Sequence, residues 1–416
     1  MAILPQSVYA LKLPKMYRVK QQFDDQQLVD IEGAVAAELA KPTVRALVKS
    51  GMRVALLVGS RGICHMDRIT RAVGENLKKM GAQPFIIPAM GSHGGGTAEG
   101  QRKVLAGYGI TEETMGMPVV SQMQVDEIGM TPSGIPICID RVAHAADLIV
   151  PLGRVKPHTD FKGPIESGLC KMLTIGLGKH EGCSRLHQYG FESFAELIPE
   201  AARVVIENAP VGFGLAILEN GYDKTCLLEA VPAREIHTRE PELLKIAKAQ
   251  MPSIMLKEID VLVIEQIGKD ISGAGMDPNI VGRTTKGPIK GFAGPKIKRI
   301  VIEGISPASH GNACGVGLAD YVLKACARQI DLPSTYTNSI GSGNPEAGRI
   351  PIQVEDEREG ILASLRTAIG VDYDALKIVK IRDTLSLGEI AVSQGLLPEV
   401  SQNGRMTMLE EINERE

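Results

Sequence analysis

Histidines and lysines gather among glycines in residues 153–190, GRVKPHTDFKGPIESGLCKMLTIGLGKHEGCSRLHQYG. This segment holds His158, His180 and His187, three of the eight histidines of the chain, and its lysines make it locally cationic. An imidazole near neutral pH can pass protons or bind a borderline metal ion, and a cationic loop attracts anions. The segment therefore predicts proton transfer or metal binding beside an anionic ligand, although a solvated basic loop would have the same composition.

A further histidine stands in a glycine-rich turn, MGSHGGGTAEGQ, residues 90–101. His93 precedes Gly94 and Gly95, and Thr97 is placed to cap a following helix. Consecutive glycines let the backbone approach a ligand closely. The pattern is neither a Walker A sequence nor G-x-G-x-x-G. We therefore expect a functional histidine here, the alternative being a histidine that only caps a turn.

Three more loops carry cations and follow predicted strands. Arg61 lies in VGSRGICHMDR, a strand–turn–helix junction whose N–H groups could hold an anion, and its guanidinium could bind a carboxylate with two hydrogen bonds. Arg283 and Lys286 lie in residues 268–287, and His310 lies in the next such loop. Open α/β sheets bind ligands beyond the carboxyl ends of their strands, so these residues are binding candidates, although ordinary surface loops would also fit.

Parallel strands are expected to position these loops. Short runs rich in Val and Ile between turn residues are typical of strands covered on both faces, and they occur at residues 54–58, 85–87, 147–151, 261–264, 300–302 and 378–381. Helical patterns lie at residues 67–81, 199–208, 318–329 and 360–369, with Asp67 expected to cap the first and Pro199 to open the second. The charged tail from Gln402 is expected to be a loose or docking helix. Alternating strands and helices predict an α/β fold with mainly parallel sheets.

The length of 416 residues exceeds what one ordinary core accommodates, so two domains are expected. A charged helical stretch gives way to the strand IDVLVIEQ near residues 251–257. This change predicts two α/β domains, residues 1–252 and residues 253–416. Both halves place polar, glycine-rich loops at strand ends, which predicts an active-site cleft between the two domains.

The charge, hydropathy and cysteine content of the chain argue against several classes of protein. Lys and Arg number 46 and Asp and Glu 49, giving a net charge of -3, and no basic run favours nucleic acid. No apolar stretch reaches the roughly 18 residues that cross a membrane, and the start lacks the order of a secretory signal. Seven scattered cysteines without CxxC spacing argue against disulfides and a thiolate zinc site. A cytoplasmic protein that binds small anionic metabolites is expected.

At these residues the sequence resembles the lactate racemase family of nickel-dependent 2-hydroxyacid racemases and epimerases. The resemblance implies two α/β domains and a nickel pincer nucleotide, pyridinium-3,5-bisthiocarboxylic acid mononucleotide with bound nickel. In the family, one arm of this cofactor is joined to a lysine in a glycine-rich turn, and a metal-binding histidine follows sixteen positions later. Here Lys171 ends the turn SGLCK, and His187 stands at that distance.

The resemblance also implies the residues that act on a substrate. A proton-transferring histidine after a glycine matches His93, and its partner before the lysine matches His158. The two would take the hydroxyl proton from opposite sides of a 2-hydroxyacid while hydride leaves its carbon for the cofactor. The remaining expected contacts are Lys171, Arg61, Gly94, Gly95 and Thr97 with the cofactor, and Arg61, Arg283 and Lys286 with the substrate.

Several positions depart from the family pattern. Gly94 stands where an arginine is common, Val58 where an aspartate is usual, and His158 precedes Lys171 by more residues than in lactate racemase itself. These differences lie where a substrate would be held, so a larger hydroxyacid such as a sugar acid is open. His180 is a second candidate for the nickel ligand.

Other interpretations of the same residues stay open. The histidines could serve a zinc- or manganese-assisted hydrolase or lyase, or the fold could be kept in an inactive carboxylate- or nucleotide-binding protein. A thiol enzyme using Cys170 or Cys183 is weakly supported, because neither cysteine lies in a nucleophile motif. Under the racemase interpretation, the expected partners are a small hydroxyacid and the proteins that synthesise the cofactor, and a homo-oligomer is compatible with it.

Overall fold

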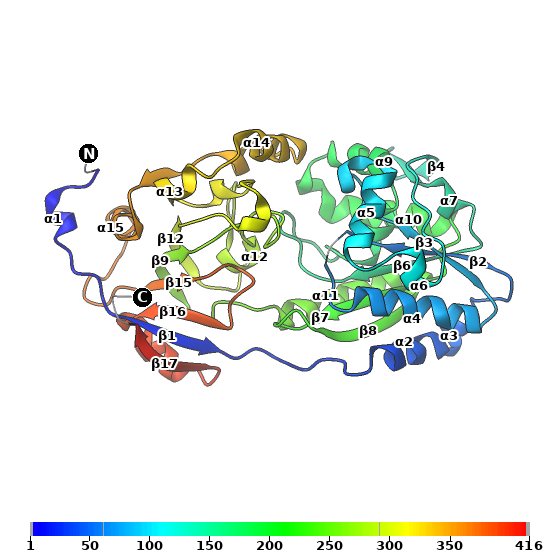
Figure 1. Ribbon diagram of the computed structural model, residues 1–416, viewed down its shortest axis with the longest axis horizontal. Coiled ribbons are helices and arrows are strands. Elements are labelled where there is room, and N and C mark those ends of the chain that lie inside the picture. Colours follow the sequence, from blue (N-terminus) through cyan, green and yellow to red (C-terminus); the bar gives the residue numbers. More distant parts are fainter. Residues whose placement is uncertain (1–2, 61, 291, 413–416) are drawn as a thin grey trace. The chain divides into compact units, whose positions relative to one another are not determined.

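The computed structural model describes residues 3–60, 62–290 and 292–412. The chain forms two compact units, whose elements are labelled in Figure 1. Residues 24–251 form one, called the central unit here, and residues 1–23 with 252–416 form the other, called the terminal unit. Arg61, predicted to contact cofactor and substrate, lies outside the described residues.

The central unit is built on a five-stranded sheet in the order β3-β2-β6-β7-β8. Its strands are β2 (Arg53–Val58), β3 (Gln83–Pro88), β6 (Leu148–Arg154), β7 (Phe213–Glu219) and β8 (Thr225–Pro232). The first four run parallel, and β8 is antiparallel to β7 at the edge. Along β2, Val54 and Leu56 enter one hydrophobic cluster while Ala55 and Leu57 enter another. Burial on both faces explains why these strands are continuous apolar runs in the sequence.

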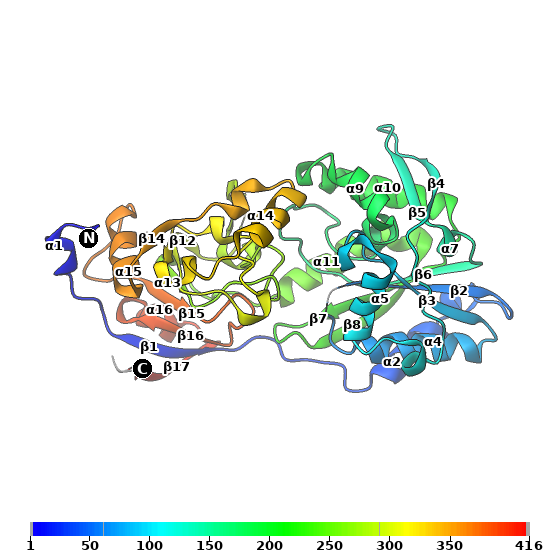
Figure 2. The ribbon, with the colours of Figure 1, turned by 45° about the horizontal axis from the view of Figure 1, so that its top comes forward.

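Helices cover both faces of this sheet. Helices α2 (Ile31–Ala40) and α4 (Met66–Lys79) pack on one face, and α10 (Phe194–Asn208) and α11 (Ile236–Gln250) on the other, as Figure 2 shows for α2, α4 and α10. The remaining elements are α3 (Pro42–Arg45), α5 (Ala98–Gly107), α6 (Glu112–Met115), the hairpin of β4 (Val125–Met130) and β5 (Pro136–Asp140), α7 (Arg141–His144), α8 (Leu169–Lys171) and α9 (Lys179–His187).

The terminal unit contains an eight-stranded sheet in the order β14-β13-β12-β9-β15-β16-β1-β17. Its strands are β1 (Met16–Gln21), β9 (Glu258–Ile264), β12 (Lys296–Ile302), β13 (Tyr321–Leu323), β14 (Ile352–Val354), β15 (Ile378–Ile381), β16 (Glu389–Ser393) and β17 (Met406–Ile412). Pairing is parallel from β14 to β15 and antiparallel from β15 to β17. Its other elements are α1 (Gln6–Tyr9), α12 (Pro278–Val281), β10 (Arg283–Thr284), β11 (Gly287–Pro288), α13 (Lys324–Ala327), α14 (Leu332–Gly341), α15 (Glu357–Thr367) and α16 (Leu397–Gln402).

The predicted α/β class with mainly parallel sheets is confirmed. All six predicted strands are present, as β2, β3, β6, β9, β12 and β15, and two predicted helices are α4 and α15. The predicted cap of α4 is wrong, since the helix starts after His65 and Asp67 lies inside its first turn. Asp67 is still favourable there, because a carboxylate near a helix N-terminus interacts well with the helix dipole.

Three further predictions about elements are wrong. Helix α10 starts at Phe194, before Pro199, because Phe194 and Leu197 bury apolar side chains ahead of the proline. Residues 321–323 are a strand rather than part of a helix, because they complete the ladder between β12 and β14. The tail forms β17, which pairs with β1, instead of a helix.

Residues 1–23, predicted to belong to the N-terminal domain, instead join the terminal unit. Strand β1 lies between β16 and β17, so that Tyr17 pairs with Val392 on one side and with Glu411 on the other. Val19 of the same strand is fully buried. The prediction failed because both partner strands lie at the other end of the chain, where no local pattern can reveal the pairing.

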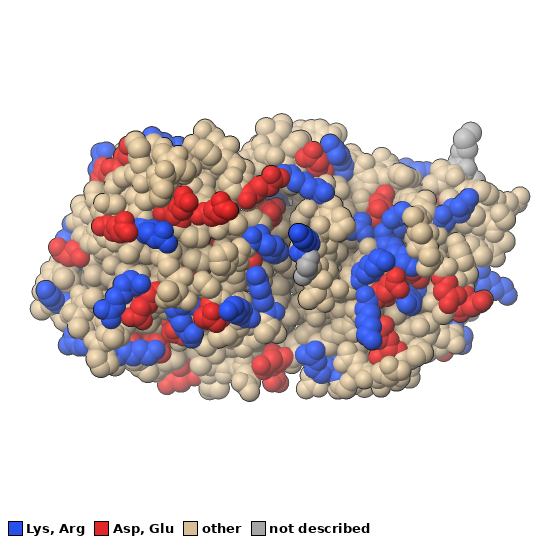
Figure 3. Space-filling view, turned by 180° about the vertical axis from the view of Figure 1, so that it is seen from behind, with Lys and Arg blue, Asp and Glu red and all other residues tan. Residues whose placement is uncertain are grey.

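One face of the protein carries charges of both signs (Figure 3). Figure 3 shows Lys and Arg beside Asp and Glu over the face that it presents. Within the described residues, the structure contains no helix with the length and apolar character required to cross a membrane.

Candidate active site

The predicted site residues of the central unit follow three neighbouring strands. Strands β3, β2 and β6 lie side by side and run parallel, so the loops that leave them start at one edge of the sheet. Ser60 follows β2, His93 follows β3, and His158 follows β6. This carboxyl edge is where open α/β sheets bind ligands.

The His93 loop depends on glycine. Gly94 and Gly95 have φ values of 66° and 67°, in the left-handed region that other residues avoid. A Cβ on Gly94 would lie 2.6 Å from the main-chain nitrogen of Gln101, whereas a Cβ on Gly95 would meet no described atom within 4 Å. The open space at Gly95 leaves room for a ligand near the main chain. Thr97 caps α5, as predicted.

Ser60 orients the exposed side chain of His93. The Oγ of Ser60 forms a hydrogen bond with Nδ1 of His93, and the Ser60 carbonyl accepts a bond of 2.7 Å from the hydroxyl of Tyr108. With Nδ1 engaged, Nε2 is the nitrogen that would exchange a proton with a substrate. Sequence reasoning missed Ser60, and its only signal was its position directly after a predicted strand.

His158 and Lys171 contact each other. The Nζ of Lys171 lies within hydrogen-bond distance of Nε2 of His158, whose side chain is buried. The main-chain N–H of Asp160 donates to Nδ1 of His158 at 3.0 Å, and the N–H of His158 donates to Glu166 at 2.6 Å. Because Nδ1 accepts, a neutral ring carries its proton on Nε2. The Nζ of Lys171 therefore faces the Nε2 side of this ring.

A buried carboxyl group supports the turn that carries Lys171. Helix α8 ends at Lys171 and continues directly into a π-helical turn, residues 172–176, a feature often found at functional sites. The Oε2 of Glu240 accepts a bond of 3.0 Å from the N–H of Cys170, while its Oε1 has no hydrogen-bond partner among the described residues. Burial raises the pKa of Glu240 to about 7, and it also raises the pKa of Cys170 well above its ordinary value. A reactive thiolate at Cys170 is therefore disfavoured.

His187 ends α9 with a ring suited to bind a metal. Its Nδ1 lies 2.7 Å from the carbonyl of Cys183, a bond that places the proton on Nδ1 and the lone pair on Nε2. Burial alone would lower the pKa of His187, but its interactions with Cys183 raise it above the ordinary value. The ring of Phe191 lies 5.5 Å from that of His187 and 5.9 Å from that of His158. One aromatic side chain thus packs beside both histidines.

The helix of His187 also abuts the His93 loop. The Oγ of Ser92 lies 3.9 Å from Sγ of Cys183, and a Cβ on Gly91 would lie 2.9 Å from the same sulfur. The central unit therefore gathers His93, His158, Lys171 and His187 around one sheet edge and the elements packed against it.

Comparison with known proteins gives a match over the N-terminal part of the chain. Residues 6–196 match the family model described as the lactate racemase N-terminal domain, and this range includes all four of these residues. Over residues 6–196 the chain is therefore similar to the lactate racemase family.

A solved structure has the same fold. The lactate racemase apoprotein from Thermoanaerobacterium thermosaccharolyticum aligns with 88% of this chain and 94% of its own, with a TM-score of 0.52 and 16% sequence identity. At this identity the similarity establishes the fold alone. No curated protein matches the sequence.

The described residues contain no group of three or more His, Cys, Asp or Glu side chains that could hold a metal ion. The donor set fits a metal that arrives with its own organic ligands and takes His187 from the protein.

Arg283 and Lys286 lie in the terminal unit. Arg283 donates to Asp320 at 2.9 Å and to the carbonyls of Ile297 and Lys298 at 2.9 and 3.3 Å, which fixes it within that unit. Lys286 lies in the turn between β10 and β11. Their contact with a substrate stays a prediction, as does any role for His180 or His310.

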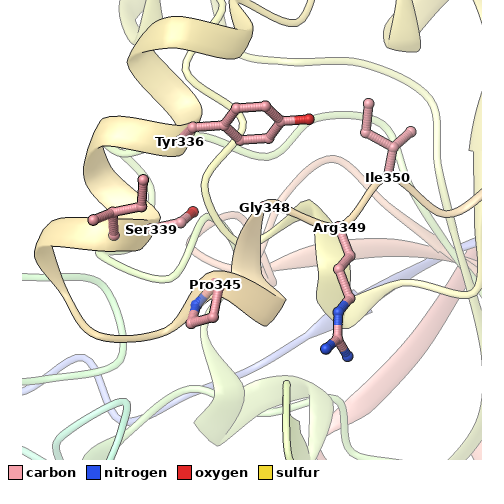
Figure 4. Close-up of a pocket in the computed structure, with 7 residues that line it drawn as sticks. Tyr336, Ser339, Pro345, Gly348, Arg349 and Ile350 are labelled. Carbon is pink, nitrogen blue, oxygen red and sulfur yellow. The ribbon is translucent and has the colours of Figure 1, made fainter.

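A hollow of about 450 Å³ in the terminal unit is separate from these residues. Figure 4 shows its lining, which comes from α14 and the segment after it: Tyr336, Ser339, Ile340, Pro345, Gly348, Arg349 and Ile350. Neither Arg283 nor Lys286 is part of this lining, so the hollow does not correspond to the predicted substrate contacts.

Proposed function

We propose that this chain racemises or epimerises a 2-hydroxyacid with a nickel pincer nucleotide as its cofactor. The match of residues 6–196 to the lactate racemase N-terminal domain and the similarity of the fold to a lactate racemase support an isomerase of this type. The observation that carries the proposal is the contact between Nζ of Lys171 and Nε2 of His158. This contact brings together, in one site, the lysine expected to hold the cofactor and a histidine expected to transfer protons.

Lys171 and His187 would hold the cofactor. The bound group would supply a hydride-accepting ring and its nickel ion. Covalent attachment would use the neutral amine form of Lys171, because only a neutral amine is a nucleophile. His187 would bind nickel through Nε2, since its Nδ1 is engaged by the Cys183 carbonyl. The main chain at Gly94 and Gly95, with Thr97, would contact the rest of the cofactor.

His93 and His158 would exchange the hydroxyl proton of the substrate. In both rings a hydrogen bond at Nδ1 fixes the orientation, from Ser60 for His93 and from Asp160 for His158. Proton exchange would then involve Nε2 of each ring, and the neutral His158 ring, which carries its proton on Nε2, would first act as a proton donor. General acid–base catalysis of this kind contributes on the order of 10²–10⁴-fold in rate.

The substrate is proposed to be a 2-hydroxyacid larger than lactate, such as a sugar acid. Arg61, Arg283 and Lys286 are the proposed contacts for its carboxylate. We further propose that the protein acts in the cytoplasm and receives its cofactor from the proteins that synthesise it.

Conversion of one stereoisomer of a 2-hydroxyacid into the other is the direct test of this function. The protein, co-expressed with cofactor-synthesis enzymes, is incubated with single stereoisomers of 2-hydroxyacids, and chiral chromatography follows the second isomer. We expect the second isomer to accumulate, and His93→Ala or His158→Ala to slow its formation by about 10²–10⁴-fold. His144→Ala, at a histidine paired with Asp126 away from these contacts, should retain the rate.

Two results of this assay would contradict the proposed function. If nickel-loaded protein leaves every 2-hydroxyacid tested stereochemically pure, or if both histidine variants turn over at the full rate, the proposed function is wrong.

A further inference from the structure

Lys179 is a fully buried lysine at the first position of α9. Its φ of 54° lies in the left-handed region, which is uncommon for a residue with a side chain. Burial lowers the pKa of its ammonium group, while Asp140 opposes that change. A buried charge is tolerated only with close partners, so the contacts of Nζ reveal what the side chain does.

Three elements supply those partners. The Nζ of Lys179 donates to the carbonyl of Pro88 at 2.6 Å and to Oε1 of Gln101 at 3.2 Å. It also lies 3.2 Å from Oδ2 of Asp140, whose Oδ1 caps α7. Pro88 ends β3, Gln101 belongs to α5, and Asp140 ends β5. One ammonium group therefore joins the strand before the His93 loop to the helix after it.

Gln101 extends this connection to the His93 loop, residues 90–97. Its side chain is fully buried, and its Nε2 donates to the carbonyls of Gly91 and His93 at 2.8 and 3.3 Å. Because Oε1 of Gln101 faces the Lys179 ammonium, the amide must point its N–H groups toward these carbonyls. Lys179 thus fixes the orientation of Gln101, and Gln101 fixes the main chain at His93.

The same loop is bound on its other side to the segment that contains Lys179. The N–H of Gly91 donates to the carbonyl of Gly176 at 3.1 Å, just before α9 begins. The main-chain N–H of Asp140 donates to the carbonyl of Leu177 at 2.9 Å. The loop of His93 and the start of the His187 helix therefore share one buried polar junction.

We propose that Lys179 is a positioning residue, which holds the main chain of the His93 loop in place through Gln101. The effect on catalysis rests on the proposed function, whereas the effect on the loop does not. The expected ligand is the same bound 2-hydroxyacid that His93 would deprotonate, and Lys179 acts on it only through the loop.

Amide hydrogen exchange of the cofactor-free protein tests the effect on the loop. Lys179→Met alone leaves Asp140 buried without its partner, so Lys179→Met/Asp140→Asn is the cleaner variant, and Gln101→Met is the independent one. We expect exchange in residues 90–97 to accelerate about tenfold or more in both, with residues 194–208 unchanged. Arg185→Met, which removes exposed ion pairs from the same helix, should leave both segments unchanged.

Two results would overturn the proposal. One is unchanged exchange in residues 90–97 of the folded variants, and the other is equal acceleration throughout the central unit, which would indicate general destabilisation. In the racemisation assay, Gln101→Met should lower kcat about tenfold or more with little change in KM or nickel content. A wild-type protein that is inactive in the racemisation assay would contradict the proposed function. The hydrogen-exchange result would still decide the role of Lys179, because it does not depend on activity.

Discussion

The ring of His187 is prepared for a metal by its own helix, through the bond from Nδ1 to the Cys183 carbonyl. We expect His187→Ala to reduce the nickel content of cofactor-loaded protein to near zero, because the described residues contain no cluster of ligands to replace it. The fold should persist, since the side chain is only half-buried at a helix end. Metal analysis and circular dichroism measure the two effects.

His180 provides the matched control on the same helix. Its side chain is exposed, and His180→Ala should keep the full nickel content. Nickel retained in His187→Ala and lost in His180→Ala would reverse the assignment of the ligand.

Residue types, together with the resemblance to the lactate racemase family, indicated the four main residues of the site, but not the groups that orient them. Ser60, Lys179 and Glu240 act through contacts with residues far away in the sequence: His93, Gln101 and Cys170. A serine after a strand, a lysine in a cationic segment and a glutamate in a charged helix give no local sign of such contacts. Only the packing of the fold shows them.

In the loop before α5, the adjacent glycines Gly94 and Gly95 allow the cost of adding a side chain to be compared at two positions. Both have left-handed φ values, so alanine at either should lower the free energy of unfolding by about 1–2 kcal/mol. Gly94→Ala should be more destabilising than Gly95→Ala, because its Cβ would also meet the main chain of Gln101. Urea unfolding of both variants measures the difference, and equal losses would mean that the loop is looser than described.

Helix α11 makes the turn of Lys171 sensitive to pH through Glu240. Its pKa is raised from 4.5 to about 7, so the protonated carboxyl group is favoured by folding. This stabilisation is complete below about pH 4.5 and is lost as the pH rises to about 7, by about 3 kcal/mol. Glu240→Gln cannot ionise, so the free energy of unfolding of this variant should lack that decrease.

Urea unfolding at pH 4.5 and pH 8 measures this change for the wild-type protein and Glu240→Gln. Glu242→Gln, in an exposed pair with Lys245 on the same helix, should follow the wild-type protein. Identical pH dependence in all three proteins would show that Glu240 does not titrate in this range.

Elements with strong local patterns were predictable, and those that depend on distant partners were not. The buried runs of β2, β6 and β9 carry their own signal, because parallel strands are apolar on both faces. The short strand β13 has only three residues, and its local sequence resembles a helix. Its conformation follows from its position between β12 and β14.

For the whole molecule, the central unit should fold independently. Both of its hydrophobic clusters are made by residues between 24 and 251. We expect a chain of residues 24–251 to unfold in one cooperative transition, measured by calorimetry. A chain of residues 252–416 lacks β1 and would expose the edges of β16 and β17, so it should aggregate until a peptide of residues 1–23 is added.

A failure of residues 24–251 to fold, or a soluble and cooperative chain of residues 252–416, would contradict this division. The division itself illustrates a limit of sequence reasoning. The boundary near residues 251–257 could be predicted, because a charged helical stretch there gives way to an apolar strand. The assignment of β1 to the terminal unit could not be predicted, because its partner strands lie at the far end of the chain.

Cofactor attachment at Lys171 is the point on which the proposed function depends. Intact mass and nickel content, measured after co-expression with cofactor-synthesis enzymes and followed by peptide mapping, test it. We predict a mass increase confined to the peptide of Lys171, together with bound nickel, and neither in Lys171→Ala, whereas Lys245→Ala keeps both. Unmodified Lys171 in a protein that racemises hydroxyacids, or full nickel in Lys171→Ala, would contradict the assignment.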